Sequence, residues 1–498
     1  MRPIHVAIVL AIAGTLIALV ACGGVRASAT TTSAKPKPLA ANAAVVTIGR
    51  PIGRPIPAGF LGLSIENNAI LPYAGSDPHA LDPVFVQLIR NLTPRQSPNF
   101  RIGGDSTDWA WYPAHGIRKP AGITVTLTQQ WVDVVHALAS TLNARLIMGV
   151  DLEADSRPLA AAEASAFERG LGRSIQALEL GNEPELYPSF SWYVAPNGHG
   201  VKGRPPSYDF NSFIGDFSSF AKSLPGPLAG SATGAPEWMA RTGQFLAAEP
   251  RVKLVSLHRY PVQTCFIRKS SPQYPTVAHL LAPYATTHLA DSVTRFVAVA
   301  HSRHLPLRID EMNTDSCGKA PGVSDAFVSA LWAIDALFEM DRVGVDGVNM
   351  HTYPGATYQM FTVAQHGTWS VKPEYYGLMM FAEAAPPGSR LDSTSSRNAK
   401  GIKIWATRGA DGRTRVVLIN ESRSPRAVGL NAPTSTTATL ERLEAPRLTS
   451  TGGVTLGGQS FKPTTGTLTG RSTATKLDPS GNRYVFSLPA NNAALITY

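Results

Sequence analysis

The sequence of 498 residues has little cysteine, with three residues, and little charge, with 16% Asp, Glu, Lys and Arg. Three cysteines are too few for a disulfide-built scaffold or a four-thiolate zinc site. Only one long apolar run occurs, at the extreme N-terminus, which excludes a multi-span membrane protein. The formal net charge is +10, but no block of basic residues indicates nucleic-acid binding. Hydrophobic residues at 44% exclude a disordered chain, and the length favours two or three globular domains.

The N-terminus has the pattern of an exported lipoprotein. The apolar run over residues 6–20 suits a signal peptide and is short for a membrane span. The motif LVAC at residues 19–22 resembles a bacterial lipobox, in which cleavage precedes a cysteine that carries lipid. We therefore expect a signal peptide over 1–21, a lipid anchor on Cys22 and a flexible tether over 22–43. The protein would then be held at a membrane, facing the cell surface or the periplasm. The alternative is ordinary signal cleavage with Cys22 as a bystander.

Short apolar runs alternate with helical periods through the middle of the chain. Eight such runs with helices between them predict a (β/α)8 TIM barrel over residues 44–386. A doubly wound open sheet is the alternative, although it would be expected to carry a glycine-rich phosphate loop after its first strand, where this chain has SIENN. The expected strands are 60–68, 100–106, 145–153, 175–185, 227–236, 252–260, 305–313 and 345–352, and expected helices include 82–91, 128–142, 161–172, 288–303 and 324–342.

The composition changes after about residue 386. The stretch 387–498 is rich in Thr, Ser, Gly and Val and has no helical period, which predicts an antiparallel β-sandwich domain. The motif ADG at residues 410–412 separates two alternating runs and predicts a hairpin. Residues 44–58, ahead of the first barrel strand, are candidates to pair with this domain. The alternating runs are 403–407, 414–420, 437–443 and 484–488.

Polar residues at the C-terminal ends of the eight strands are mostly carboxylates. Reactive groups of such barrels lie at these ends. An acid-lined mouth without a nucleotide loop or a metal-spaced His cluster indicates glycoside hydrolysis, which needs two carboxyl groups on either side of one bond. No metal and no cofactor are expected. The strand-end residues are Glu66, Asn67, Asp105, Asp108, Asp151, Glu153, Asn182, Glu183, Glu237, His258, Tyr260, Glu311, Asn349 and His351.

The most specific motif is LGNEPE at residues 180–185, after the fourth expected strand. It resembles the clan A glycoside hydrolases, retaining barrels with an Asn-Glu pair after strand four and a Glu after strand seven. The motif RIDEMN at 308–313 supplies a Glu on the seventh expected strand, so motif and strand count agree. The resemblance implies that Glu183 is the general acid and base and Glu311 the nucleophile, with carboxyl groups about 5–5.5 Å apart.

Asn182 and Tyr260 are expected to support this pair. Asn182 would hydrogen-bond the sugar 2-hydroxyl. Tyr260 ends the sixth expected strand, beside the seventh, so its hydroxyl could hold Glu311 in place. The alternative for Tyr260 is a partly buried aromatic residue with a solvated hydroxyl.

Within clan A the chain resembles glycoside hydrolase family 79, the β-glucuronidases and heparanase-like enzymes, over the barrel and the C-terminal β-domain. The motif RIGGDS at 101–106 looks like the Gly-Gly loop of that family, whose next residue, here Asp105, meets the sugar. Glu66 lies where the family places another sugar-binding acid. The resemblance therefore implies a carbohydrate substrate.

The motif YPGATY after strand eight looks like the loop that grips the glucuronate carboxylate in this family. It implies that Gly355, Ala356 and Tyr358 donate hydrogen bonds to that anion. One departure is present: where the family commonly has Tyr-Gly-Gly, this chain has Ser-Cys-Gly at 316–318, so only Gly318 keeps the role of a small residue near the carboxylate.

Two cysteines follow neighbouring strands. Cys265 follows the sixth expected strand and Cys317 the seventh, so the two loops are adjacent. In an oxidising compartment this pair is expected to form a disulfide at the rim of the active site.

The sequence thus predicts an exported, lipid-anchored retaining β-glucuronidase that hydrolyses β-glucuronides or glucuronate-containing glycans. The positive net charge agrees with an acidic substrate. One alternative is a clan A β-glycosidase for a neutral sugar such as glucose, xylose or arabinose. Another is a non-catalytic, glycan-binding surface lipoprotein on a degenerate barrel, which would usually have lost one of the two glutamates.

Overall fold

The computed structural model describes residues 39–364, 367–432 and 436–498. The expected signal peptide over 1–21, Cys22 and most of the tether over 22–43 lie outside these residues. In the described part of the chain, no helix is long and apolar enough to cross a membrane.

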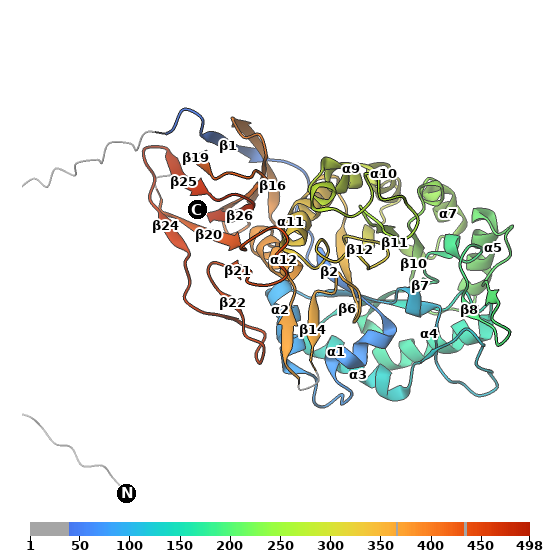
Figure 1. Cartoon of the computed structure of the whole chain (residues 1–498). Helices are drawn as coiled ribbons and strands as arrows, with labels where there is room; N and C mark the ends of the chain where they lie inside the picture. The colour runs from blue at the N-terminus through green and yellow to red at the C-terminus, as the bar shows by residue number, and fades with distance from the viewer. Residues whose placement is uncertain (1–38, 365–366, 433–435) are drawn as a thin grey trace, which may run out of the picture. The chain divides into compact units, whose positions relative to one another are not determined.

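Eight parallel strands close into a barrel, and they are the eight strands expected from the sequence. The fold class is therefore confirmed. In order around the barrel the strands are β10 (Leu228–Thr233), β11 (Val252–Arg259), β12 (Leu307–Met312), β13 (Gly347–Thr352), β2 (Leu61–Ile65), β3 (Asn99–Ile102), β6 (Arg145–Val150) and β7 (Ile175–Leu180) (Figure 1).

The barrel strands are buried along almost their whole length, because side chains on one face fill the barrel and those on the other pack against helices. This double burial explains why the strands are rich in apolar residues. The helices are α1 (Ile70–Ala74), α2 (Pro83–Leu92), α3 (Gln129–Leu142), α4 (Arg157–Leu171), α5 (Phe210–Ala221), α6 (Pro236–Met239), α7 (Thr242–Ala248), α8 (Val277–Leu280), α9 (Thr287–Asp291), α10 (Thr294–His301), α11 (Phe327–Arg342) and α12 (Pro373–Ala384).

The single helix expected over 288–303 is wrong, since two shorter helices, α9 and α10, occupy this stretch. The Ser292 hydroxyl donates to the Leu289 carbonyl at 2.6 Å. The Val293 N–H bonds to the Ala290 carbonyl, three residues back, at 3.1 Å. A side-chain donor thus takes the carbonyl that would continue the helix, and the helix breaks there.

The second core belongs to a ten-stranded sheet, in which every strand except β1 follows the barrel in the sequence (Figure 1). The hairpin expected at 410–412 is present, since it joins two of its strands with Arg408 opposite Thr414. The strands are β1 (Ala44–Pro51), β16 (Arg390–Arg397), β17 (Ile402–Arg408), β18 (Thr414–Asn420), β19 (Arg426–Asn431), β20 (Ala438–Glu444), β21 (Thr455–Leu456), β24 (Thr475–Leu477), β25 (Arg483–Leu488) and β26 (Asn492–Thr497).

Strand β16 connects the two halves of this sheet. Its first two residues pair with β17 and the rest of the strand pairs with β1. Val46 and Val428 from one half share a core with Val416 and Ile496 from the other, so the halves face each other as in a sandwich. One detail departs from the expected antiparallel arrangement: β1 pairs with β19 in parallel.

The β-domain contacts the barrel at helix α11, which lies between β12 and β13 in the sequence. The first N–H groups of this helix have no side-chain cap; Phe327 and Val328 donate instead to the carbonyls of Ser450 and Leu448 at 2.8 and 2.9 Å. Trp405 of β17 stacks on Phe338 of the helix, with ring centroids 5.3 Å apart. The β-domain therefore fixes a helix whose flanking strands carry polar groups of the barrel mouth.

Within the residues that the structure describes, the loops contain four short two-stranded ribbons. They are β4 (Ala110–Trp111) with β5 (Val125–Thr126), β8 (Tyr193–Val194) with β9 (Gly200–Val201), β14 (Phe361–Val363) with β15 (Trp369–Val371), and β22 (Ser460–Phe461) with β23 (Leu468–Thr469). The 3-10 turns are Asn67–Ala69, Asp105–Thr107, Gly172–Ser174, Pro184–Leu186 and Pro283–Ala285.

Candidate active site

A cavity of about 370 Å³ opens at the C-terminal ends of the barrel strands. This is the end at which barrels of this type carry their chemistry. Its lining mixes carboxylates with aromatic side chains. The lining residues are Glu66, Asp105, Asp108, Trp109, Glu153, Asn182, Glu183, Leu186, Tyr187, Phe190, Ser191, Trp192, Cys265, Phe266, Glu311, Ser316, Cys317, His351, Tyr353 and Tyr358.

Glu183 stands on a sharp turn directly after β7. Gly181 and Glu183 both have left-handed backbone angles, with φ of +79° and +46°. A side chain at Gly181 would collide with the Tyr187 hydroxyl, 2.5 Å from the position of a Cβ. The Glu183 N–H is held by the Ala232 carbonyl at 2.9 Å. A non-glycine residue in this conformation is costly and persists where surrounding structure enforces it, which is typical of functional positions.

Glu311 lies within β12, and each of its carboxylate oxygens has a donor. The Tyr260 hydroxyl donates to Oε1 at 2.8 Å, and Arg101 Nη1 donates to Oε2 at 2.6 Å. Burial alone would raise the pKa of Glu311, but the charges of His351, His258 and Arg101 and the Tyr260 hydrogen bond lower it well below the ordinary value. Glu311 is therefore ionised at neutral pH, the state that a nucleophilic carboxylate requires.

Glu183 and Glu311 face the same space. An oxygen of each lies within 4.8 Å of the other and of a His258 ring nitrogen. Carboxyl pairs of inverting glycosidases are about 6.5–9.5 Å apart, whereas retaining pairs are about 5–5.5 Å apart. The spacing here therefore fits the retaining geometry.

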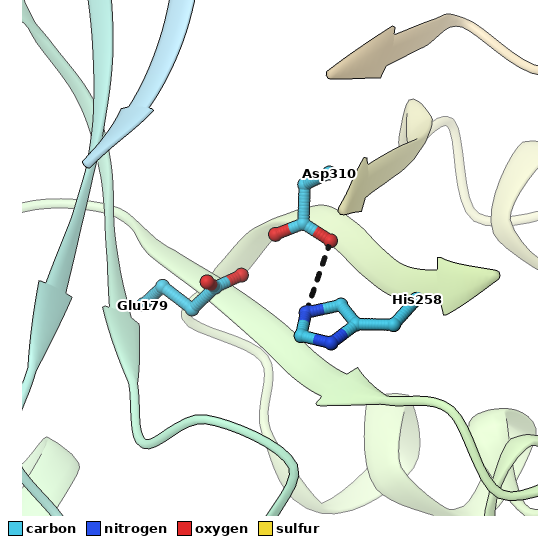
Figure 2. A group of neighbouring side chains, drawn as sticks. All are labelled: Glu179, His258 and Asp310. Carbon is cyan, nitrogen blue, oxygen red and sulfur yellow. Dashed lines mark ion pairs between the residues drawn. The ribbon is translucent and has the colours of Figure 1, made fainter. Parts of the chain in front are cut away.

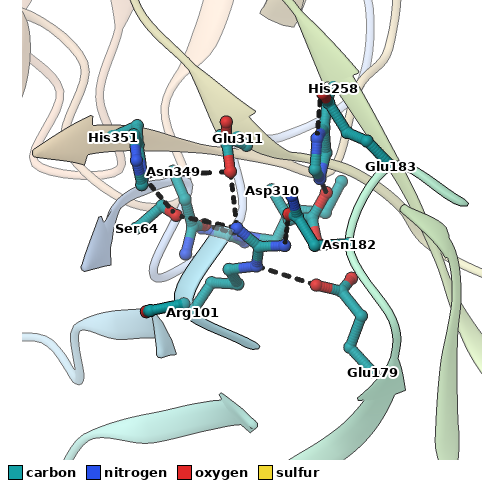
Figure 3. A network of polar contacts seen from close by, with 12 residues as sticks. Ser64, Arg101, Glu179, Asn182, Glu183, His258, Asp310, Glu311, Asn349 and His351 are labelled. Carbon is teal, nitrogen blue, oxygen red and sulfur yellow. Dashed lines mark hydrogen bonds and ion pairs between the residues drawn. The ribbon is translucent and has the colours of Figure 1, made fainter. Parts of the chain in front are cut away.

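Arg101 of β3 bridges β7, which precedes Glu183, and β12, which carries Glu311 (Figure 3). Its guanidinium is fully buried and donates to Glu179 Oε2, Asn182 Oδ1 and Glu311 Oε2, at 2.7, 2.7 and 2.6 Å. Such a planar donor fixes the direction of each acceptor as well as compensating charge. Arg101 therefore positions both Asn182 and Glu311.

His258 lies between Glu183 and a second carboxylate pair. Its Nδ1 lies 3.0 Å from Glu183 Oε1. Its Nε2 lies 3.7 Å from Asp310 Oδ1 (Figure 2). Burial would lower the pKa of His258, but Glu311, Glu183 and Asp310 raise it to about 10. The ring is thus a cation at neutral pH and donates to Glu183.

Asp310 and Glu179 lie near the His258 ring on the side away from Glu183, and both are buried inside the barrel (Figure 2). Burial and the negative charge of Glu179 raise the pKa of Asp310 well above its ordinary value. Burial opposes the ionisation of Glu179 too, but Arg101 lowers the pKa of Glu179 below its ordinary value. The pair therefore holds one negative charge, which balances part of the cationic charge of Arg101 and His258.

Two groups of described side chains have the spacing of metal ligands: Glu179, His258 and Asp310, and Glu183, His258 and Glu311. His258 belongs to both. The guanidinium of Arg101 already compensates the charge of Glu179 and Glu311. The donor set as it stands therefore favours ion pairs over a bound cation.

Glu66 and Asp105 lie together on the other side of the mouth. Glu66 accepts from the Ser106 N–H at 2.9 Å and lies 3.4 Å from His351 Nε2. A side chain at Gly104 would collide with Glu66, so this second glycine of the Gly-Gly loop leaves room for the carboxylate. Asp105 reaches the solvent of the cavity but is surrounded by protein. Dehydration there, and the charges of Glu66, Glu183 and Glu311, raise its pKa to about 8.

The expected carboxylate loop contributes tyrosines to the cavity rather than backbone donors. Tyr353 and Tyr358 line the cavity, whereas Gly355 and Ala356 do not. The Gly355 N–H donates to Gln359 Oε1 at 3.0 Å, and the Ala356 N–H lies 3.3 Å from the Tyr353 carbonyl.

Gly318 supports this loop from outside the cavity lining. Its carbonyl accepts from the Thr357 N–H at 2.8 Å, and a Cβ at Gly318 would lie 3.1 Å from the Tyr353 hydroxyl. The loop after β12 and the loop after β13 are therefore packed together at the rim.

The expected disulfide between Cys265 and Cys317 is present. Both cysteines line the cavity, so the bond joins the loops after β11 and β12 at the rim. Phe266 follows directly in the sequence and also lines the cavity, so the disulfide restrains its backbone.

Sequence reasoning missed the aromatic wall of the cavity. Trp109, Phe190 and Trp192 come from irregular loops, where no period marks a side chain as inward or outward. In the sequence, Arg101 stands out only as part of a motif. Conversely, Glu237 is expected at a strand end, but it lies exposed in α6, outside the cavity lining.

Comparison with known proteins agrees with this geometry. A family model described as the glycosyl hydrolase family 79 C-terminal beta domain matches residues 404–495. A β-glucuronidase of Neurospora crassa is 24% identical over 437 residues, which cover 74% of this chain and 72% of that protein. A β-glucuronidase of Aspergillus niger is 24% identical over 378 residues, which cover 66% of this chain and 65% of that protein.

Solved structures share the fold. The structure of a 4-O-α-L-rhamnosyl-β-D-glucuronidase from Fusarium oxysporum has a TM-score of 0.70 at 21% identity and covers 91% of this chain and 100% of that chain. A GH51 arabinofuranosidase from Xanthomonas axonopodis pv. citri has a TM-score of 0.63 at 14% identity and covers 91% of this chain and 99% of that chain. The expected resemblance to glycoside hydrolase family 79 is thus confirmed.

Proposed function

We propose that the protein is a retaining β-glucuronidase that hydrolyses glucuronides by double displacement. The observation that carries the proposal is the pair of Glu183 and Glu311, whose oxygens lie within 4.8 Å of each other in an open cavity. The similarity to two fungal β-glucuronidases supports the sugar assignment.

In the first step Glu311 Oε attacks the anomeric carbon and forms a glycosyl ester as the glycosidic C–O bond breaks. Glu183 gives its proton to the departing oxygen, so the aglycone leaves as an alcohol. The low pKa of Glu311 keeps the nucleophile ionised, and Tyr260 and Arg101 hold its two oxygens.

In the second step Glu183, now a carboxylate, takes a proton from water. The water oxygen bonds to the anomeric carbon from the side that the aglycone left, and Glu311 is released. The cationic His258 donates to Glu183, which stabilises the carboxylate between the two steps. The sugar leaves with its original β configuration.

Asn182, Glu66 and Asp105 would bind sugar hydroxyls. The Asn182 amide has one N–H bonded to Asp105 at 3.2 Å, and its second N–H is the donor for the 2-hydroxyl. The Asp105 carboxyl lines the cavity and can hydrogen-bond a sugar hydroxyl.

Tyr353 and Tyr358 are the proposed donors for the sugar carboxylate. Both line the cavity, and Tyr358 is buried next to Tyr260, with ring centroids 6.3 Å apart. The Gly355 and Ala356 amides would join them only after exchanging their present partners within the loop. Gly318 keeps the space in which Tyr353 and Tyr358 stand.

The test is aglycone release from 4-nitrophenyl β-glucuronide and from the matched β-glucoside. A preference for the glucuronide, with the β-anomer as the first product in an NMR time course, supports the proposal. Preferred cleavage of the glucoside would instead indicate a neutral-sugar β-glycosidase with the same two glutamates. Loss of this preference in Tyr358→Phe identifies the carboxylate site.

We also propose that the protein is exported and anchored to a membrane through a lipid on Cys22. The support is the sequence pattern alone: an apolar run over 6–20, followed by LVAC. Cys22→Ala should move the protein from the membrane fraction to the soluble fraction of cells. Retention of this variant in membranes would contradict a lipid on Cys22.

A further inference from the structure

The cavity has two chemically different ends. One end is formed by β2, β3 and β13, which are neighbours in the barrel: His351 lies in β13, and Glu66, Asp105, Tyr353 and Tyr358 lie in the loops after these three strands. The proposed function places the sugar among these polar side chains.

The opposite end is built by loops after β7 and β11. The strands β7, β10 and β11 are consecutive in the barrel and lie across its mouth from β13, β2 and β3. Glu183 follows β7, and a proton donor must face the leaving oxygen. The aglycone therefore leaves toward the end formed by β7 and β11.

Two phenylalanines stand exposed at this end. Phe190 is 41% exposed and Phe266 is 64% exposed, although most phenylalanines of the described chain are buried. Their ring centroids lie 5.1 Å apart at an interplanar angle of 53°. Both line the same cavity as Glu183, so they form an apolar edge beside the departing group.

The surroundings hold this edge in place. The disulfide of Cys265 restrains the backbone next to Phe266. Trp192 donates from its ring nitrogen to the Asp108 carbonyl at 2.7 Å, and Leu186 and Trp192 line the cavity on the same loop as Phe190. The apolar surface is thus available without ordering a loop at the moment of binding.

The charge of the cavity argues against a polyanionic aglycone. Six of the described lining residues carry carboxyl groups, and no residue of this lining is Lys or Arg. A polyanionic aglycone would need several cationic side chains beside the leaving group, and this lining offers no Arg or Lys there. The net charge of +10 is therefore no guide to what enters this cavity.

We propose that Phe190 and Phe266 form an aglycone subsite for an uncharged aromatic group, so that the preferred substrates are small aryl glucuronides. The inference rests on the proposed function for its sugar. An aromatic aglycone would pack on the two rings in offset or edge-to-face contact, next to the proton donor.

The experiment uses the full chain and four substrates in a two-by-two set: 2-naphthyl and methyl glycosides of β-glucuronate and of β-glucose. A β-glucuronyl-galactose disaccharide is the fifth. Phe190→Ala and Phe266→Ala should each lower the naphthyl-to-methyl ratio of kcat/KM by about three- to tenfold, mainly through the KM of the naphthyl substrate. The naphthyl-to-methyl ratio of each variant is divided by that of the wild type, so that the different acidities of the two leaving groups cancel.

Controls separate the subsite from general damage. Val194→Ala removes an exposed apolar side chain of the same loop that is outside the cavity lining, and it should keep the wild-type ratio. Phe266→Tyr keeps an aromatic ring, so its naphthyl-to-methyl ratio of kcat/KM should stay close to that of the wild type. A ratio within twofold of wild type in both alanine variants overturns the proposal. So does an equal loss on the disaccharide, because the rings would then serve a sugar.

The sugar arm of the set tests the proposed function separately. If only the glucosides are cleaved, and the preference for the naphthyl glucoside is lost in the two alanine variants, the glucuronidase assignment is wrong and the aglycone subsite is supported. If neither sugar is cleaved, fluorescence titration with 2-naphthol decides. Binding that the two alanine variants weaken supports the subsite, and absence of binding overturns it.

Discussion

The Tyr260 hydroxyl donates to Glu311 Oε1 at 2.8 Å, across the gap between β11 and β12. This hydrogen bond is one of the contributions that lower the pKa of Glu311. It also leaves the carboxylate little freedom to rotate, since Arg101 holds the other oxygen.

Tyr260→Phe should lower kcat about 10- to 100-fold, the usual effect of removing a hydrogen bond to a charged group. Without this donor the pKa of Glu311 rises. Glu311 acts when ionised, so the acidic limb of the kcat/KM profile should move to higher pH. A pH profile of the variant measures this. An unchanged acidic limb with a large loss of kcat would mean that Tyr260 acts elsewhere.

Glu311→Gln should abolish turnover and leave the fold intact, because the amide is isosteric but cannot attack the anomeric carbon. The matched control is Glu237→Gln, an exposed carboxyl of α6 outside the cavity, which should keep wild-type activity. Single-turnover assays and thermal unfolding measure both effects. Near-native activity of Glu311→Gln would remove Glu311 as the nucleophile.

Glu183→Ala should slow substrates with poor leaving groups far more than activated aryl glucuronides, because only poor leaving groups need protonation in the first step. Deglycosylation then becomes rate-limiting, and azide should restore it by attacking the glycosyl-enzyme without a general base. The product to detect is β-glucuronyl azide. Equal losses for activated and poor leaving groups, without rescue, would contradict the assignment.

Replacing Cys265 and Cys317 by serine should lower the free energy of unfolding by about 2–4 kcal/mol, since the disulfide closes a loop between residues separated by 52 positions. Denaturant unfolding of wild type and variant under oxidising conditions measures the difference. The same wild-type protein in reductant is the control and should reproduce the loss. A stability equal to wild type would mean that the bond does not form in the protein.

Glu383 of α12 faces Glu441 of β20, and burial together with this neighbour raises the pKa of Glu383 from 4.5 to about 8. The folded state therefore holds the proton more tightly than the unfolded chain. Its contribution to stability is present in full below about pH 4.5 and is lost progressively until pH 8. Glu383→Gln should be more stable than wild type at pH 8.5 and closer to it at pH 5. Urea unfolding at both pH values measures this, with Glu237→Gln as the unchanged control.

The barrel could be predicted because its strands are buried on both faces. The strands β2 (LGLSI) and β6 (RLIMGV) are almost fully buried and almost fully apolar, whereas β12 and β13 are buried but carry polar side chains among the apolar ones. The strand limits were less accurate: the fourth expected strand reached residue 185, but β7 ends at Leu180, where the left-handed Gly181 and Glu183 turn the chain.

Long-range features were beyond the sequence pattern. The parallel pairing of β1 with β19 joins residues more than 370 positions apart, and neither strand carries a local sign of its partner. Arg101 reads as one polar residue in a buried strand; only the fold brings Glu179, Asn182 and Glu311 around it. The side chains of the aromatic wall lie in loops, whose direction depends on contacts such as Trp192 with Asp108.

The position of β1 has a consequence for synthesis on the ribosome. Its neighbours in the sheet are β16 and β19, so its partners emerge about 340 to 380 residues after it (Figure 1). At roughly 5–20 residues per second, β1 waits about 20 to 70 s with its backbone N–H and C=O groups unpaired. During this interval the second core cannot form, because the partners of β1 are still missing. Until they are made, residues 44–51 are open to strand pairing with other chains.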